Sequence, residues 1–432
     1  MDSMDNFRER FEALAQRTEH VHQHTRLVAR RRRWWRSIAC GVGLLVGLLS
    51  LARTSQAADF ACPAGDVACL IAAINTANAN GEANTIRLKA GTYTLTAVDN
   101  DTDGPNGLPS VTSTLTLQGT GADATSIARE GSIFSPPFFR LLHVAATGRL
   151  TLKRLTLRGG VIFSGPGRGG GIYNAGGIVT VTHSTLVSNE SHDGGGVSNH
   201  GGMVTVTHST IAGNNAVNQG GIANIKGTVT ISDSTIADNR GDAVQGVGIL
   251  NGGFMTIRNS TIARNVGGLA SGIFNGGQLL IVNSTIADNV PQVGGFAGSG
   301  GGIVTLGTGS TVLLNTILAR NGRPSDCSGR VTSLGTNLIG DPTGCTITLQ
   351  PTDLTGDPGL DTFTDDGTPG NGHFPLLPTS QAIDTGNTAA CPLTDQLGQR
   401  RIGPCDIGAI RFLDHSDVQQ ENGATAAPQA TK

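Results

Sequence analysis

The nine residues Ile231-Ser-Asp-Ser-Thr-Ile-Ala-Asp-Asn239 are one copy of a sequence that this chain of 432 residues repeats with small changes. Six copies end in an asparagine, and these asparagines are 25, 25, 26, 24 and 32 residues apart: Asn189, Asn214, Asn239, Asn265, Asn289 and Asn321. A second signature, Gly-Gly-Ile-x-Asn or a variant of it, precedes the first five copies with the same period. A fixed period of this length is typical of a repeat protein.

The residues that fill each repeat indicate strands. Val, Ile and Thr alternate in short runs that Gly-Gly and Asn-Gly interrupt, and no window is long enough for a helix. The pattern predicts three brief strands per repeat, so that each repeat of about 25 residues forms one coil of an all-β solenoid, a parallel β-helix. Equivalent residues would then stack at the inter-strand spacing of about 4.8 Å, and about nine coils would make a rod roughly 45 Å long.

Stacking turns the repeat into columns of equivalent positions. Around the copy quoted above, Val229, Ile231, Ser234 and Ile236 are predicted to point into the core. The position before the serine holds residues that are enriched at left-handed backbone geometry, and we interpret it as a bend: His183, His208, Asp233, Asn259 and Asn283. The position before the closing asparagine alternates in charge, as an exposed ladder would: Asp238, Arg264, Asp288 and Arg320. The closing asparagines are predicted to form a hydrogen-bonded ladder of their own.

The N-terminal 58 residues differ from the repeats. Residues 1–36 are polar and basic, and a short heptad pattern at 7–28 indicates either weak self-association as a coiled coil or a solvated helical leader. The Arg30–Arg36 run is followed by an apolar stretch at 38–52 and by small residues up to Ala58. Segment 37–58 therefore has the parts of a signal peptide; the competing interpretation is an uncleaved anchor that enters the membrane through residues 38–52. Either alternative predicts a secreted or cell-envelope protein.

Cysteine usage supports export. Six of the seven cysteines fall into three local pairs: Cys62 with Cys69, Cys327 with Cys345, and Cys391 with Cys405. An even number in local pairs predicts three disulfides formed in an oxidising compartment. A metal site is the rival interpretation, but no Cys-x-x-Cys pair is present and the couples lie far apart in sequence.

A capping helix is predicted where the exported part begins. Residues 66–78 carry Leu70, Ile71 and Ile74 at helical spacing, and residues 85–96 then alternate as a strand. A solenoid exposes an open hydrophobic end unless something covers it. We therefore expect this helix to cap the first coil.

The same region resembles a known family. Cys69-Leu-Ile-Ala-Ala-Ile-Asn-Thr-Ala-Asn78, followed by Ala90-Gly-Thr-Tyr-Thr-Leu-Thr96, is similar to the start of secreted bacterial right-handed parallel β-helix proteins, although the polar Ser, Arg and Glu of that family's opening motif are absent. The Asn-Ser-Thr-Ile-Ala-x-Asn coils resemble those of polymorphic outer-membrane and pectate-lyase-like β-helices. The resemblance implies a right-handed solenoid.

The C-terminal part has its own signature. His373-Phe-Pro-Leu-Leu-Pro-Thr-Ser-Gln-Ala-Ile-Asp-Thr-Gly386, Cys391-Pro-Leu-Thr-Asp-Gln-Leu-Gly398 and Cys405-Asp-Ile-Gly-Ala409 resemble the domain called choice-of-anchor Q, which ends such β-helices before varied surface anchors. Its aspartates, Asp384, Asp395 and Asp406, are expected to be structural. The chain is thus expected to comprise a leader at 1–36, a signal peptide or anchor at 37–58, a cap with the first strands at 59–112, the β-helix at 113–345, the C-terminal module at 346–412 and a disordered tail at 413–432.

Candidates for chemistry are few. The pectate-lyase-like resemblance implies, for an enzyme, clustered carboxylates that often hold calcium beside an Arg or Lys base. The weak candidates for zinc would lie on successive rungs: His183, His208 and Asp233. The weak candidates for calcium belong to an acidic loop: Asp353, Asp357 and Asp361. Bends and turns explain both sets without a metal, so we assign no catalytic residue and expect no cofactor, with calcium as the open alternative.

Composition limits the classes of partner and function that the sequence allows. A net charge of −2 and the lack of a basic patch in the exported part argue against a nucleic-acid partner. Tyr173 and Phe274 alternate with Ser198, Ala223 and Leu250 in their column, which we interpret as a tolerant packing position. We expect a non-enzymatic extracellular or envelope protein for adhesion, glycan contact or surface structure, whose partner is a polysaccharide or a surface protein. The alternative is a polysaccharide lyase or glycoside hydrolase that acts on an extracellular polysaccharide.

Overall fold

The computed structural model describes residues 57–165, 167–241, 247–268, 270–291, 300–322 and 325–413. The chain divides into two units, Met1–Thr54 and Ser55–Lys432, and the account below concerns the second. The leader at 1–36, the apolar stretch at 38–52 and the tail from 414 onward lie outside the described residues. Within the described ranges, no helix has the length and apolar character needed to cross a membrane.

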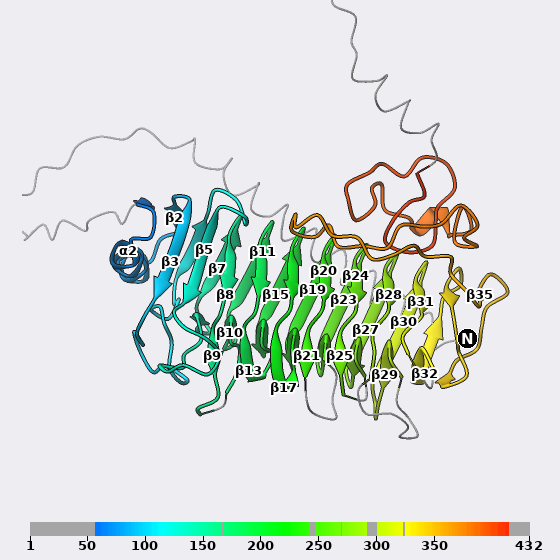
Figure 1. Ribbon diagram of the computed structural model, residues 1–432, viewed down its shortest axis with the longest axis horizontal. Helices are drawn as coiled ribbons and strands as arrows, with labels where there is room; N and C mark the ends of the chain where they lie inside the picture. Colours follow the sequence, from blue (N-terminus) through cyan, green and yellow to red (C-terminus); the bar gives the residue numbers. More distant parts are fainter. Residues whose placement is uncertain are drawn as a thin grey trace, which may run out of the picture. The chain divides into compact units, whose positions relative to one another are not determined.

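The described part is a right-handed parallel β-helix of about ten turns with about 26 residues per turn, as the repeat predicted (Figure 1). The strands of the described coils fall into four rows, which we number in chain order. Three rows match the three predicted strands. The additional short row, row 3, has strands in five of the coils that the structure describes.

Rows 1 and 4 belong to one sheet of 19 strands. Row 1 comprises β1 (Asp59–Cys62), β2 (Asn84–Leu88), β4 (Thr114–Gln118), β7 (Arg149–Lys153), β11 (Ile178–Thr182), β15 (Met203–Thr207), β19 (Thr228–Ser232), β23 (Phe254–Arg258), β27 (Gln278–Val282), β30 (Ser310–Leu314) and the end of β32 (Cys327–Ser333). Row 4 comprises β6 (Leu142–Val144), β10 (Ile172–Asn174), β14 (Val197–His200), β18 (Ile222–Ile225), β22 (Ile249–Asn251), β26 (Ile273–Asn275), β29 (Ile303–Thr305), the start of β32, and β34 (Cys345–Thr346).

Rows 2 and 3 form separate sheets. Row 2 comprises β3 (Gly91–Leu95), β5 (Thr125–Arg129), β8 (Thr156–Arg158), β12 (Thr185–Val187), β16 (Thr210–Ala212), β20 (Thr235–Ala237), β24 (Thr261–Ala263), β28 (Thr285–Ala287), β31 (Ile317–Ala319), β33 (Leu338–Ile339) and β35 (Leu354–Thr355). Row 3 comprises β9 (Val161–Ile162), β13 (Glu190–Asp193), β17 (Asn215–Gln219), β21 (Arg240–Gly241) and β25 (Val266–Gly267).

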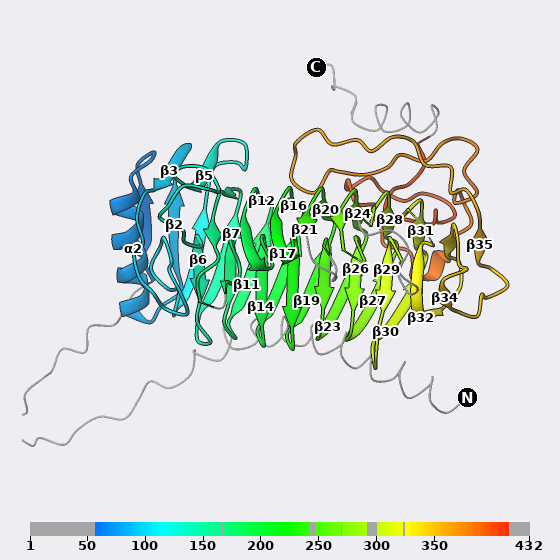
Figure 2. The same ribbon diagram turned by 60° about the horizontal axis from the view of Figure 1, so that its bottom comes forward.

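The first coil is capped as predicted. Helix α2 (Val67–Asn80) begins at Asp66, whose carboxylate accepts a hydrogen bond from the backbone N–H of Cys69 at 2.9 Å. It ends at Gly81, which has a left-handed backbone. Leu70 and Ile74 are fully buried against the first strands, so the helix closes the hydrophobic end of the core (Figure 2).

The predicted columns are confirmed. Val229, Ile231, Ser234 and Ile236 are fully buried, and the bend column has left-handed backbone, with φ between 45° and 52° from His183 to Asn283. The closing asparagines are buried and bonded in series, for example Asn189 Nδ2 to Asn214 Oδ1 at 3.0 Å. Satisfied side-chain amides in an apolar interior specify the register of the stack, because an amide buried there without a partner is costly.

The glycines of the Gly-Gly-Ile-x-Asn signature permit close approach between coils. A Cβ atom placed on Gly221 would lie 2.3 Å from the carbonyl oxygen of Gly248 in the next coil. No side chain fits there, which explains why the signature before row 4 carries glycine at this position.

The segment after β35 lies against the outer face of row 2, where Figures 1 and 2 show it in orange and red. Gly370 N donates to Thr210 Oγ1 at 2.8 Å, and Ala409 N donates to Thr285 Oγ1 at 3.1 Å. Small side chains of row 2 pack beneath it in a second hydrophobic cluster: Ala237, Ala263, Ala287 and Ala319. The threonines from Thr210 to Thr285 and the alanines from Ala237 to Ala319 therefore contact the C-terminal segment, whereas the serine and isoleucine of each repeat face the core.

Candidate functional site

The outward column of row 4 changes residue type along its first coils. In register, His143 pairs with Tyr173, and Tyr173 pairs with Ser198. Ser110 occupies the rung before His143, because Val111 forms a parallel bridge with Val144. The next four coils carry apolar residues at the same position, from Ala223 to Val304. Polar chemistry in this column is thus concentrated at its N-terminal end.

Tyr173 lies at the centre of this region and is 6% exposed. The ring centroids of Tyr173 and His143 are 5.6 Å apart, and those of Tyr173 and His200 are 5.4 Å apart in an edge-on arrangement. The guanidinium carbon of Arg140 lies 4.9 Å from the tyrosine ring centroid, a cation–π contact. An Arg168 guanidinium nitrogen lies 3.5 Å from the phenolic oxygen. We call Asp103, Arg140, His143, Arg168, Tyr173 and His200 the Tyr173 cluster.

Arg140 fixes a loop over the cluster. Its side chain is fully buried and donates to the backbone oxygens of Asp103 at 2.9 Å and Arg168 at 3.1 Å, and to Asn106 Oδ1 at 3.0 Å. Burial lowers the pKa of Arg140 to about 10, so the guanidinium remains charged at neutral pH. Asp103 itself has a left-handed backbone, φ 54°, which aspartate tolerates better than most residues. These bonds present the Asp103 carboxylate to His143.

The two histidines of the cluster are neutral at physiological pH. Burial is the largest cause that lowers the pKa of His143; Arg140 adds to it and Asp103 opposes it. Burial and Arg168 lower the pKa of His200 to about 4, with Asp193 opposing. A neutral imidazole can donate one hydrogen bond and accept another, so both rings suit hydrogen bonding or proton transfer better than ion pairing.

Three buried polar atoms around Tyr173 have no hydrogen-bond partner among the described residues: Arg168 Nε, Ser198 Oγ and His200 Nε2. Ser198 is fully buried. Buried polar groups are nearly always paired with protein, water or ligand. This is the part of the described chain where unpaired hydrogen-bonding capacity and aromatic surface coincide.

The zinc candidates are brought together only in part. His183 and His208 are exposed and stack in parallel, with ring centroids 4.9 Å apart and planes 6° apart. Asp233 instead accepts a hydrogen bond from Asn259 Nδ2 in the next coil at 2.6 Å. Across the described ranges, no three His, Cys, Asp or Glu side chains are placed to hold one metal ion.

The acidic loop follows turn chemistry. Asp353 Oδ1 accepts from Asn337 N at 2.9 Å, Asp357 Oδ1 from Gly359 N at 3.0 Å, and Asp361 Oδ1 from Thr362 N at 2.7 Å. Each carboxylate thus satisfies nearby backbone donors. The calcium candidates do not converge on one point.

The aspartates and arginines of the charge column form ion pairs between successive coils. Arg264 binds Asp238 with its closest N···O distance at 2.6 Å, and Arg320 binds Asp288 at the same distance. Both arginines also lie over rings of the C-terminal segment, Phe363 for Arg264 and Phe374 for Arg320. The column serves docking of that segment and offers no free catalytic carboxylate.

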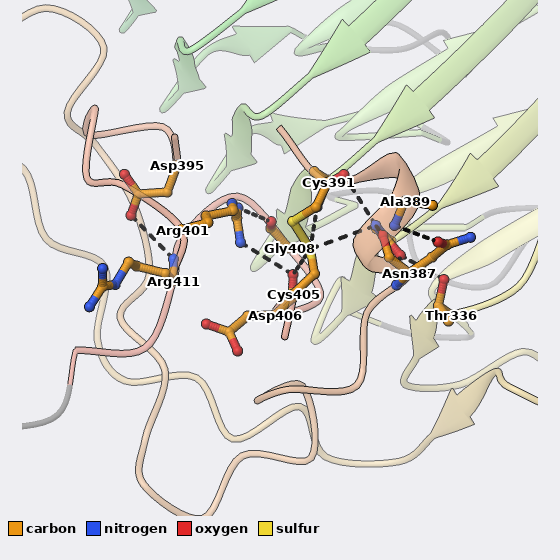
Figure 3. Close-up of a disulfide and its surroundings, with 12 residues drawn as sticks. Thr336, Asn387, Ala389, Cys391, Asp395, Arg401, Cys405, Asp406, Gly408 and Arg411 are labelled. Atoms are coloured by element: carbon orange, nitrogen blue, oxygen red, sulfur yellow. Dashed lines mark hydrogen bonds between the residues drawn. A yellow bond between two sulfur atoms is a disulfide. The ribbon is translucent and has the colours of Figure 1, made fainter. Parts of the chain in front are cut away.

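The three predicted disulfides are present: Cys62–Cys69, Cys327–Cys345 and Cys391–Cys405. Figure 3 shows the third of these with the buried polar groups around it. The Asp395 carboxylate accepts from the backbone N–H of Arg411, and Arg401 donates to the carbonyl oxygens of Gly408 and Asp406. Together with Asp384 N, which donates to Asp406 Oδ1 at 2.8 Å, these bonds fold the module and leave its aspartates structural.

A cavity of about 520 Å³ lies where the last coils meet the C-terminal segment, with Arg320, Asp326 and Leu377 among its lining residues. Asp326 is buried, and burial raises its pKa. Its Oδ1 accepts from Asn321 N at 2.8 Å, and its Oδ2 accepts from Asp341 N at 2.7 Å. Asp326 therefore ends the asparagine ladder, and its oxygens are already engaged.

The Tyr173 cluster was missed in the sequence. The sequence predicts a tolerant packing position at Tyr173, because the recognisable signature starts only with Gly-Gly-Ile-Tyr-Asn174. A signal was available one coil earlier, since Leu142-His-Val144 has the same apolar-x-apolar form and places His143 in register with Tyr173. Asp103 and Arg140 lie outside any repeat, so no periodicity could indicate them.

Comparison with known proteins identifies the fold. The model of the right handed beta helix region matches residues 141–317. No curated protein matches the chain. Among solved structures, the A-module of mannuronan C-5 epimerase AlgE6 from Azotobacter vinelandii is 15% identical with a TM-score of 0.32, covering 68% of this chain and 92% of that one. The A-module of AlgE4 from the same organism is 15% identical with a TM-score of 0.25, covering 67% and 93%.

At this identity and these TM-scores, the two epimerase modules carry no argument about activity. The match over residues 141–317 and the parallel register of every strand pair agree with each other. The comparisons thus support one conclusion, that this chain contains a right-handed β-helix.

Proposed function

We propose that this protein is an exported β-helix that binds an acidic polysaccharide on the outer face of row 4, at the Tyr173 cluster. The observation that carries the proposal is the set of buried, unpaired donors and acceptors beside one aromatic ring: Arg168 Nε, Ser198 Oγ and His200 Nε2 around Tyr173. Sugars are recognised by such hydrogen-bonding groups beside apolar or aromatic surface.

The charge of the cluster favours an anionic sugar. Arg140 and Arg168 supply two guanidinium groups, and both histidines are neutral, while the opposing charges come from Asp103 and from Asp193 beside His200. Arg140 uses its donors on the loop, which leaves Arg168 as the group available to a carboxylate. Guanidinium and carboxylate form charge-assisted hydrogen bonds that are stronger than neutral ones.

The outer face of row 2 is the other long surface that could bind a polysaccharide, but it is already covered. The C-terminal segment occupies the outer face of row 2 from Thr210 to Ile317 and forms hydrogen bonds to its threonines. A ligand that runs along the rod is therefore kept from row 2, whereas row 4 carries the cluster.

Calorimetric titration of the fragment from residue 59 onward tests the proposal. Uronate oligosaccharides are compared with neutral oligosaccharides of the same length, with and without calcium. We expect the uronates to bind and Arg168→Gln to weaken binding at least tenfold, because it removes the charge that faces the carboxylate. The matched control is Arg158→Gln, an identical change at an exposed position of row 2, which should leave affinity unchanged. Equal binding of neutral sugars, or equal effects of both variants, would refute the site.

A second function, chemistry on the bound polysaccharide, is favoured by one further observation. A phenol and two neutral imidazoles lie in contact within the cluster, and these groups serve as general acids and bases. Release of unsaturated or reducing ends from a uronate polysaccharide, lost in Tyr173→Phe, would make this protein a lyase or hydrolase. Binding without products would leave it a binding protein.

Export is proposed from separate observations. Three disulfides indicate an oxidising environment, and segment 37–58 has the composition of a signal peptide or anchor. N-terminal sequencing of the protein from its native cell envelope tests this. A start at Asp59 or Ala58 indicates cleavage, an intact leader in the membrane fraction indicates an anchor, and an intact leader in the cytosol would refute export.

A further inference from the structure

A chain of hydrogen bonds links three side chains beside the Tyr173 cluster. Ser110 Oγ lies within hydrogen-bonding distance of His143 Nδ1. His143 Nε2, the other ring nitrogen, lies 3.1 Å from Asp103 Oδ2. The imidazole thus stands between a hydroxyl and a carboxylate, with one nitrogen directed at each.

Each member is held in place by the fold. His143 is 1% exposed and fixed in the middle of β6, while Arg140 holds the Asp103 backbone. Ser110 is partly exposed, and its carbonyl oxygen accepts from Asn78 Nδ2 at 2.7 Å. A serine hydroxyl on an imidazole that a carboxylate orients is the arrangement that activates serine as a nucleophile, and it is recognised by geometry rather than by chain order.

The tautomer of His143 follows from its two hydrogen-bond partners. An ionised carboxylate only accepts hydrogen bonds, so the ring proton resides on Nε2 and is donated to Asp103. Nδ1 then carries a lone pair and can accept the proton of Ser110. Burial lowers the pKa of His143, Arg140 lowers it further and Asp103 opposes both. Only the neutral ring can act as a base.

From this geometry we infer that Ser110, His143 and Asp103 form a nucleophilic site that hydrolyses O-acyl esters, such as an acetyl ester on a sugar hydroxyl. Ser110 Oγ attacks the ester carbonyl, its proton passes to His143 Nδ1, and the ester C–O bond breaks as that proton moves to the departing sugar oxygen. Water then attacks the acyl-serine and gives a proton to His143, which returns it to Ser110 as the carboxylic acid leaves. Asp103 stabilises the imidazolium in both steps.

The sugar part of this inference rests on the proposed polysaccharide site, because Ser110 lies in the same outward column as Tyr173, two rungs away. The serine chemistry does not depend on it. A small ester or a covalent probe reaches Ser110 without the polysaccharide, so failure of one proposal can be told from failure of the other.

Covalent labelling of the fragment from residue 59 onward with a fluorophosphonate tests the serine directly. We expect a single adduct, located by peptide mass spectrometry on the peptide that contains Ser110. Ser110→Ala should abolish it. Asp103→Asn should slow labelling at least tenfold while keeping a residue that tolerates the left-handed backbone. The matched control Ser126→Ala, on the partly exposed Ser126 of β5, should label like the natural sequence.

Two further readouts separate catalysis from a structural role. The labelling rate should fall with acid only below the ordinary histidine pKa of 6.5, because the pKa of His143 is lowered. Hydrolysis of p-nitrophenyl acetate should be lost in Ser110→Ala, while uronate binding, if present, persists. No adduct on the natural sequence, or an adduct that survives Ser110→Ala unchanged, would overturn the inference.

Discussion

The outer faces of row 2 and row 4 show two uses of one solenoid. On row 2 the sequence repeats almost unchanged from Thr210 to Thr285; each of these threonines bonds to the C-terminal segment, and the alanines from Ala237 onward pack against it. On row 4 the outward position changes at each coil, from His143 to Tyr173 to Ser198. Regularity marks the face that serves the fold, whereas the irregular positions gather the titratable and aromatic groups.

The largest expected effect tests the core that both faces share. Ile231→Asp places a carboxylate without a partner among stacked aliphatic side chains, so we expect a loss of roughly 4 kcal/mol or more in the free energy of unfolding. The control is Thr230→Asp, next to it in β19 but exposed, which should cost far less. Denaturant unfolding measures both, and equal stabilities of the two variants would reverse the assignment of inward and outward positions.

The second prediction concerns the attachment of the C-terminal segment to row 2. Gln396 is buried, donates to the carbonyl oxygens of Gly370 at 2.6 Å and Gly372 at 2.8 Å, and accepts from Thr261 Oγ1 at 2.6 Å. Gln396→Ala leaves these groups unpaired and should cost about 2 kcal/mol.

Limited proteolysis is the measurement, because cleavage should speed up within 357–413 while the coils stay intact. Gln399→Ala, at a partly exposed position of the same loop, is the control. Faster cleavage in the coils themselves would mean that the segment is part of the solenoid core and does not merely cover it.

A smaller effect is expected from the row 4 face as pH falls. The pKa of His200 is about 4 in the folded state and 6.5 ordinarily, so between these values the unfolded chain binds more protons. Stability should therefore decrease as pH falls from 6.5 toward 4. His200→Gln should flatten this dependence in thermal melts, and an unchanged slope would mean that His200 titrates normally.

The smallest effect concerns the exposed charge pairs. Asp238→Asn breaks the ion pair with Arg264, in which both side chains are 43% exposed. We expect a loss of about 0.2–1 kcal/mol that shrinks in high salt. A double-mutant cycle with Arg264→Gln separates the ion pair from the contact of Arg264 with Phe363. A coupling energy between Asp238 and Arg264 above about 1 kcal/mol would mean that the charge column stabilises the coils themselves and does not only dock the C-terminal segment.

The fold could be predicted because its information is periodic. The inward columns, the bend at His183, the asparagine ladder and the disulfides each recur or pair locally in the sequence, and each was confirmed. The capping helix followed from apolar spacing and from the physical need to cover an open end.

The candidate site could not be predicted for the converse reason. Asp103 and Arg140 lie in irregular segments whose positions depend on where the chain returns between coils. Asp103 precedes Tyr173 by 70 residues in the sequence and reaches it only through His143, and no motif indicates this arrangement. The partners of the repeated threonines were equally hidden, since Gly370 and Gln396 reach them across more than 130 residues.

Hydrogen–deuterium exchange, measured with and without a uronate oligosaccharide, tests the central contrast most directly. The account predicts new protection in row 4 at residues 142–144, 172–174 and 197–200, and unchanged exchange along row 2 from Thr210 to Ala319. Protection confined to row 2, or spread evenly over both faces, would contradict the assignment of row 4 as the binding face.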